Sequence, residues 1–175
     1  MANFLSCIPF VLKHEGGYYS NPVTGEVVNF GITKDLLIRI KYIIQDPKLL
    51  TVEQAQAIYQ QYFWTPLNLD QVTSNLVAQK ILDMNVNMQF GEATKLTQAS
   101  LNSLGFPSVV DGILGPHTMI ELNACIATEV AGVAGEMRLL DELRIKSIGY
   151  YKAIPDPGNA IAGWLARAND IGVNV

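Results

Sequence analysis

The chain reads His14-Glu15-Gly16-Gly17-Tyr18 where its first apolar segment stops, and Gly31-Ile32-Thr33 follows after a polar loop. In front of this stretch, apolar residues recur at near-helical spacing and predict one face of a first helix. They are Phe4, Leu5, Ile8, Val11 and Leu12. Glu15 then falls in the last turn of this helix, where Gly16 or Gly17 can take the left-handed conformation that ends it.

The end of a helix is an unfavourable place for a negative charge. The helix dipole is negative there and costs a carboxylate roughly 0.3–1 kcal/mol. Partial burial would disfavour the charged form further. Because general acid catalysis requires a carboxylic acid that holds its proton near neutral pH, Glu15 is the first candidate for a catalytic residue.

Turn and capping residues divide the rest of the chain into helices and one region of strand character. The segment from Gly16 to Ile32 combines turn residues with the β-branched pair Val27-Val28, which predicts a loop or small hairpin. Residues 70–90 are apolar on more than one side, which predicts the central helix. Further helices are expected over 33–44, 51–64 and 93–104, from Pro116, over 127–152, and around Trp164 after the break Pro155-Asp156-Pro157-Gly158. The expected fold class is mainly α, a helical bundle around a central apolar helix, with strands confined to the loop after the first helix.

Composition and charge bound the class of protein. Hydrophobic residues make up 49% of the 175 and charged residues only 16%, which predicts a compact domain with a real core. The net charge of −4, without a basic cluster, argues against nucleic acid as a partner. Cys7 and Cys125 are expected as buried thiols, since they are too few for a disulfide framework or a zinc site. The apolar segment 4–12 is too short to span a bilayer, so no stable membrane association is expected.

Four ordered blocks of the chain resemble glycoside hydrolase family 108, lysozyme-like N-acetylmuramidases found as phage endolysins and in bacteria. The first block is Glu15-Gly16-Gly17-Tyr18 with Asn21-Pro22 and Asn29-Phe30-Gly31-Ile32-Thr33. The second is Asp83-Met84-Asn85-Val86-Asn87. The third joins Leu96-Thr97-Gln98 to Asp111-Gly112-Ile113-Leu114-Gly115-Pro116-His117-Thr118, which resembles a peptidoglycan-binding motif. The last is Arg144, Tyr150-Tyr151 and Gly163-Trp164-Leu165-Ala166-Arg167.

The resemblance implies a lysozyme-like α+β fold in one domain over residues 1–175. A catalytic part would span 1–90, and a peptidoglycan-binding-like helical part over 91–175 would pack on it. The resemblance also implies that Glu15 is the catalytic acid and that the substrate is the β-1,4 bond between N-acetylmuramic acid and N-acetylglucosamine in peptidoglycan. We expect a monomer that needs no metal or other cofactor. It would be made in the cytoplasm without a signal peptide and reach the cell wall through a holin, a secretion system or lysis.

The loop between the two glycine stretches departs from the family's pattern. It is shorter, with Thr24 where the second loop acid usually stands and Val28 in place of a threonine. Glycoside hydrolysis normally uses two carboxyl groups, about 5–5.5 Å apart when the second is a nucleophile and about 6.5–9.5 Å apart when it activates water. Glu26 is the nearest replacement and could line the cleft if the loop folds back. The alternative is a solvated loop glutamate.

Further residues are candidates for contacts with the sugars, each with a structural alternative. The aromatic ones could stack on sugar faces or pack in the core. The polar ones on the 70–90 helix could bind acetamido groups or form a structural network, because buried polar groups need partners. The candidates are Tyr18, Asn29, Phe30, Asp83, Asn85 and Asn87. Trp164 and Arg167 are expected to dock the last helix, and the glycines of the 111–116 block have a structural explanation in turn formation.

Two other functions stay open. One is a non-catalytic peptidoglycan-binding protein on the same fold, which the missing loop acid and threonine would allow. The other keeps the enzyme but places it in a bacterial antagonism system. Release of new reducing ends from peptidoglycan separates the enzyme from the binding protein.

Overall fold

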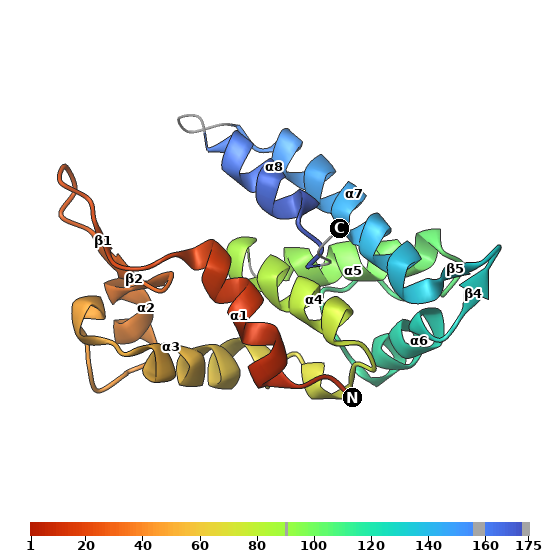
Figure 1. Cartoon of the computed structure of the whole chain (residues 1–175), viewed down its shortest axis with the longest axis horizontal. Coiled ribbons are helices and arrows are strands. Elements are labelled where there is room, and N and C mark those ends of the chain that lie inside the picture. The colour runs from red at the N-terminus through yellow and green to blue at the C-terminus, as the bar shows by residue number, and fades with distance from the viewer. Residues whose placement is uncertain (90, 156–159, 173–175) are drawn as a thin grey trace.

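The computed structural model describes residues 1–89, 91–155 and 160–172. Within these ranges the chain forms eight α-helices and two small antiparallel sheets (Figure 1). The helices are α1 (Phe4–Glu15), α2 (Lys34–Arg39), α3 (Val52–Tyr59), α4 (Asn75–Asn87), α5 (Glu92–Ser103), α6 (Pro116–Ile126), α7 (Gly135–Ala153) and α8 (Ile161–Asn169). The strands are β1 (Tyr19–Ser20), β2 (Val27–Asn29), β3 (Ile32–Thr33), β4 (Glu129–Val130) and β5 (Val133–Ala134). The mainly α fold class with a small β region after the first helix is confirmed.

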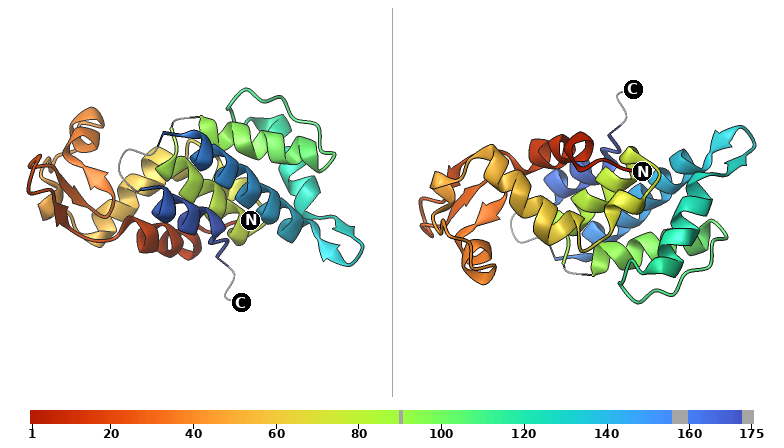
Figure 2. Two further views of the ribbon diagram at one scale, coloured as in Figure 1. Left: turned by 90° about the horizontal axis from the view of Figure 1, so that it is seen from above. Right: turned by 90° about the horizontal axis from the view of Figure 1, so that it is seen from below.

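The molecule is elongated, with the three-stranded sheet and α2 at one end and the β4–β5 hairpin at the other (Figure 2). Helix α4 lies between these ends and contacts α1, α5 and α7. Every residue from Val77 to Met84 is buried, which confirms α4 as the central helix. One apolar core joins side chains from both halves of the chain, for example Val11, Leu82 and Leu139. None of the described helices is long and apolar enough to cross a membrane.

Helix α1 ends where the glycine pattern predicts. Asn3 caps its beginning, with the side-chain oxygen accepting a hydrogen bond from the Ser6 N–H. At the other end Gly16 has φ 70°, and its N–H donates to the Leu12 carbonyl oxygen. Such a positive φ suits glycine because the residue has no Cβ. Glu15 is therefore the last helical residue.

The three-stranded sheet is a meander whose second turn contains two residues. Tyr19 pairs with Val28 between β1 and β2, and Asn29 pairs with Ile32 between β2 and β3. Phe30 and Gly31 form the turn between β2 and β3, and both have positive φ, 51° and 73°. Two-residue hairpin turns of this kind match the twist of the strands. The turn carries the Gly31 backbone to the end of α1.

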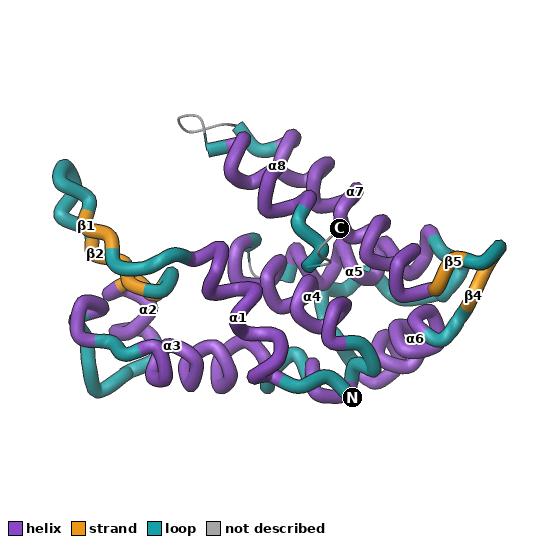
Figure 3. The backbone as a smooth tube through the Cα atoms, viewed as in Figure 1, coloured by secondary structure: helices purple, strands orange, loops and turns teal. Residues whose placement is uncertain are grey.

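Several predicted boundaries are wrong. Helix α2 ends at Arg39 rather than at residue 44, and α4 begins at Asn75 rather than at residue 70, with Ser74 as its N-cap. Helix α7 begins at Gly135, not 127, and the residues before it form the β4–β5 hairpin, which was not predicted (Figure 3). Its turn residues Ala131 and Gly132 have φ 52° and 76°. Ala-Gly is not among the dipeptides that signal such a turn, since alanine rarely adopts positive φ.

Two predicted features lie partly outside the described residues. Phe90, the end of the predicted central helix, and Asp156, Pro157 and Gly158 of the predicted break lie outside the described residues. Helix α8 follows that break and contains Trp164, as predicted.

The 111–116 block is a loop organised around one buried amide. Gln98 on α5 donates to the Asp111 carboxylate at 2.7 Å and to the Ile113 carbonyl oxygen at 3.0 Å. Its amide oxygen accepts from the Gly112 N–H at 2.9 Å. Pro116 then begins α6. These contacts agree with the structural alternative of turn formation.

Candidate active site

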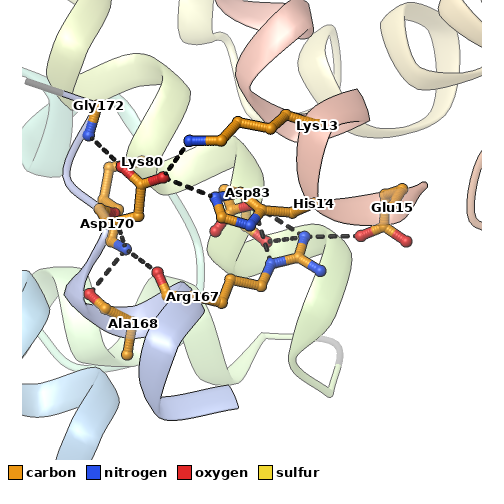
Figure 4. A network of polar contacts seen from close by, with 9 residues as sticks. All are labelled: Lys13, His14, Glu15, Lys80, Asp83, Arg167, Ala168, Asp170 and Gly172. Carbon is orange, nitrogen blue, oxygen red and sulfur yellow. Dashed lines mark hydrogen bonds and ion pairs between the residues drawn. The ribbon is translucent and has the colours of Figure 1, made fainter. Parts of the chain in front are cut away.

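Glu15 lies at the junction between α1, the β2–β3 turn and α8. Its Oε1 atom is 2.6 Å from Nη2 of Arg167, a residue near the end of α8 (Figure 4). The Glu15 side chain is 14% exposed, and Oε1 itself is buried, so the exposed part lies elsewhere on the side chain. The chain directly after it, from Gly16 to Ser20, is exposed. Glu15 is thus a largely buried carboxylate next to an open segment.

The β2–β3 turn lies directly against the Glu15 carboxylate. A Cβ atom at Gly31 would overlap Glu15 Oε2 and would lie 2.8 Å from Glu15 Cδ and 2.7 Å from the Tyr59 hydroxyl oxygen. Tyr59 in turn donates a hydrogen bond to the Phe30 carbonyl oxygen at 2.8 Å. Burial raises the pKa of Tyr59, and the nearby charge of Glu15 raises it further, so its hydroxyl keeps its proton. Glycine at 31 is therefore required twice, by the positive φ and by the close approach of Glu15.

Arg167 connects Glu15 to a second carboxylate. Its Nε and Nη2 atoms lie 3.0 and 2.8 Å from Oδ1 of Asp83, which is 3% exposed on α4. Burial disfavours the charged guanidinium, but Asp83 and then Glu15 outweigh that effect and raise the pKa of Arg167. One guanidinium thus contacts two carboxylates. Its Nε and Nη2 atoms lie against Asp83, and Nη2 also lies against Glu15.

A second set of contacts holds the end of α8. Lys80 on α4 is 1% exposed, and its Nζ donates to three carbonyl oxygens at the end of α8 and just beyond it (Figure 4). Asp170 follows α8, and its carboxylate lies 2.8 Å from Lys13 Nζ and 3.2 Å from His14 Nε2. These two residues precede Glu15 on α1. The last turn of α1 is therefore joined to the end of α8 through Lys13 and His14 as well as through Glu15.

The structure places the predicted sugar-contact residues in different surroundings. Tyr18 is 51% exposed and follows Glu15 closely along the chain, whereas Phe30 is half-buried against the core. Asn29 is buried, and its amide nitrogen lies 3.1 Å from the Pro47 carbonyl oxygen and 3.4 Å from that of Leu50. Asn29 thus fastens β2 to the 47–50 segment. A role in substrate binding stays a prediction for all three residues.

The polar residues of α4 also have protein partners. Asp83 is paired with Arg167, and Asn85 donates to the carbonyl oxygen of Ile81 one turn earlier at 2.9 Å. Asn87 donates to the Tyr151 hydroxyl at 2.6 Å. Tyr151 stacks on Trp164 of α8, with ring centroids 5.8 Å apart. The structural network considered for α4 is present, and it binds α4 to α7 and α8.

Glu26 does not share a cavity wall with Glu15. It is exposed at the β1–β2 loop and lines an open hollow of about 830 Å³. The lining also includes Thr24, Thr33, Lys34, Asp35, Asp46 and Pro47, and Glu15 is not among the lining residues. The structure brings Glu15 together with Arg167 and Asp83 rather than with Glu26.

The sequence predicts that Arg167 docks the last helix and does not indicate its contact with Glu15. The predicted docking of the last helix is present, since Trp164 of α8 stacks on Tyr151 of α7. The only sequence signal for the contact between Arg167 and Glu15 is the element Gly163-Trp164-Leu165-Ala166-Arg167, which ends in this arginine. Among the described residues, no group of three or more His, Cys, Asp or Glu side chains could hold a metal ion.

Comparisons with known proteins bear on the family and the fold. Residues 8–88 match the family model described as Glycosyl hydrolase 108, and this segment contains Glu15, Gly31 and Asp83 but not Arg167. Among solved structures the chain is similar to SagA of Brucella abortus, with a TM-score of 0.74 at 23% sequence identity. That match covers 96% of this chain and 90% of SagA, so the two share a fold over nearly their whole length. No curated protein matches the chain significantly. The resemblance to glycosyl hydrolase family 108 is thereby confirmed for residues 8–88, which carry the glutamate and the glycine turn against it.

Proposed function

We propose that this glycoside hydrolase is an N-acetylmuramidase. It would cleave the β-1,4 bond between N-acetylmuramic acid and N-acetylglucosamine in peptidoglycan, with Glu15 as the general acid. One observation carries the proposal: the only carboxylate of the Glu-Gly-Gly motif is held between Gly31 and Arg167, next to the exposed segment from Gly16 to Ser20. The match of residues 8–88 to the glycosyl hydrolase family model supports the reaction class.

The contacts of Glu15 suit an acid that takes up and gives away a proton. When Glu15 is protonated, Arg167 keeps its two contacts with Asp83, so no buried charge loses its partner. When Glu15 has given its proton to the glycosidic oxygen, the new carboxylate has Arg167 beside it at 2.6 Å. These contacts stabilise the carboxylate that remains after Glu15 has donated its proton.

Hydrolysis also needs a group that attacks the sugar from the opposite face, either a carboxylate or an activated water. In this proposal water attacks, and Glu26 is the candidate to activate it from the β1–β2 loop. The enzyme would act on the cell wall, after release through a holin, a secretion system or lysis. Neither a metal nor another cofactor takes part.

The test uses purified peptidoglycan and the variant Glu15→Gln, which keeps the size of the side chain. We expect the variant to fold like the wild type and to release no new reducing ends. Products of the wild type are reduced with borohydride and hydrolysed. Muramitol identifies a muramidase, whereas glucosaminitol would show that the other glycosidic bond is cut. Glu26→Gln, assayed in parallel, is expected to slow release if Glu26 activates the water.

Two results would contradict the proposal. Wild-type release by Glu15→Gln would remove Glu15 from the mechanism. Sedimentation of the wild type with peptidoglycan, without any new reducing ends, would favour the non-catalytic binding protein instead.

A further inference from the structure

Lys80 is a buried lysine whose hydrogen-bonding capacity is used by one helix end. Its ammonium lies 3.1, 3.0 and 2.7 Å from the carbonyl oxygens of Arg167, Ala168 and Asp170. An ammonium has three N–H donors, so the three carbonyls match it. Lys80 therefore binds backbone carbonyl oxygens, whereas Glu15, Asp83 and Arg167 meet one another through their side chains.

The chemistry of a helix end explains the position of Lys80. The last carbonyl groups of a helix lack partners within the helix, and they carry the negative end of its dipole. A buried cation there satisfies the carbonyls and stabilises the end of the helix. Burial lowers the pKa of Lys80 to about 8, against the opposing effects of Asp83 and Asp170. The ammonium is thus kept in the core although burial disfavours its charge.

Arg167 is the residue that connects this helix end to the site. Its backbone carbonyl accepts from Lys80, and its side chain reaches both Asp83 and Glu15. Lys80 and Asp83 are neighbours on α4 and hold the same arginine from its two ends (Figure 4). A shift of the end of α8 would therefore move the guanidinium relative to Glu15.

We propose that Lys80 is a positioning residue for the catalytic acid: by holding the C-terminal carbonyls of α8 it places Arg167 on Glu15. The catalytic part of this inference rests on the proposed function of Glu15. It makes α8, which lies outside the family-matched segment, a required part of the active site. A lysine that served stability alone would leave the Arg167–Glu15 contact intact when removed.

The first experiment measures the coupling between Lys80 and Arg167 in catalysis. Lys80→Met, Arg167→Met and the double variant are compared with the wild type for the rate of reducing-end release at saturating peptidoglycan. We expect a fall of about tenfold for Lys80→Met with little change in KM, a larger fall for Arg167→Met, and no further fall in the double variant. Independent, multiplying effects would overturn the proposal, because such effects do not pass through a shared contact.

A matched control separates positioning from loss of stability. Leu101→Ala removes a fully buried side chain from α5, which has no part in the Lys80 network. It should lower the melting temperature but keep the rate per folded molecule. Lys80→Gln keeps two N–H donors and should retain an intermediate rate, which also preserves the test if Lys80→Met does not fold. A Lys80→Gln rate equal to that of the wild type would overturn the proposal.

The second experiment does not depend on activity. The Nε–H of Arg167 donates to Asp83 at 3.0 Å, so its proton should exchange slowly with water in the ¹H–¹⁵N spectrum. We expect faster exchange of this proton in Lys80→Met and unchanged exchange in Leu101→Ala. Unchanged exchange in Lys80→Met would overturn the positioning role. If the wild type released no reducing ends, the proposed function would fail while this measurement still decided whether Lys80 places Arg167.

Discussion

Gly31→Ala tests whether the β2–β3 turn fixes the position of Glu15. Gly31 has φ +73°, and an added Cβ would overlap Glu15 Oε2. The same atom would lie 2.8 Å from Glu15 Cδ, whereas ordinary contact begins at 3.4 Å. The Cδ contact alone requires the carboxylate or the turn to move by more than about half an ångström, and the overlap with Oε2 requires about an ångström or more.

Two effects of the substitution have to be separated, strain and displacement. An alanine at positive φ costs roughly 1–2 kcal/mol wherever it stands. Gly25→Ala isolates this cost, because Gly25 has φ +72° in the preceding loop and nothing within 4 Å of the added Cβ. Displacement of a catalytic group by about 1 Å can lower the rate about 100-fold. Because a shift of this order is required here, we expect a loss of about 10- to 100-fold for Gly31→Ala and none for Gly25→Ala.

The assay compares reducing-end release by both variants at a temperature where each is folded, with melting temperatures measured alongside. Gly25→Ala should lose stability and keep its rate, whereas Gly31→Ala should lose both. Equal rates in the two variants would refute the reasoning that the turn positions Glu15. If Gly31→Ala raises KM and leaves the maximal rate unchanged, Gly31 would instead act in substrate binding.

Two further predictions concern the surroundings of the site. Asn29→Ala removes the amide that contacts the Pro47 and Leu50 carbonyl oxygens. The free energy of unfolding, measured by urea titration, should therefore fall by about 1–3 kcal/mol. Unchanged stability with a raised KM would instead support the predicted sugar contact. Lys80 has a pKa of about 8 in the folded protein against 10.5 as its ordinary value, so the unfolded chain holds this proton to higher pH. Relative to Lys80→Met, the stability of the wild type should therefore rise by roughly 3 kcal/mol between about pH 8 and pH 10.5, and a difference that stays flat or falls with pH would contradict the burial of the charged amine.

The parts of the fold that could be predicted depend on local patterns. The end of α1 at Glu15 follows from apolar spacing and a glycine beyond it, and the central helix follows from apolar residues on several of its sides. The β4–β5 hairpin was missed because Ala131 adopts a positive φ that its residue type does not indicate. Local patterns also could not separate a buried amide such as Asn29 from one that faces a cleft, since both are polar residues beside apolar ones.

The contacts of the candidate site were beyond reach for a different reason. Arg167 meets Glu15 and Asp83 only because α8 packs beside α7 and ends over α4, and no spacing in the sequence encodes that packing. Lys80 illustrates the same limit, because its partners are backbone carbonyls, which every residue type provides.

The groups around Glu15 come from two distant parts of the chain. The segment 8–88 contains Glu15, the turn against it, and Lys80 and Asp83 on α4, yet the Arg167 guanidinium that contacts both Glu15 and Asp83 comes from α8. Without α8, Asp83 would be a buried carboxylate without its ion-pair partner, which is strongly unfavourable. Folding of α8 onto α4 therefore completes the charge balance of the core and the surroundings of Glu15 in one step. The same packing that stabilises the C-terminal half thus organises the surroundings of the Glu15 carboxylate in the N-terminal half.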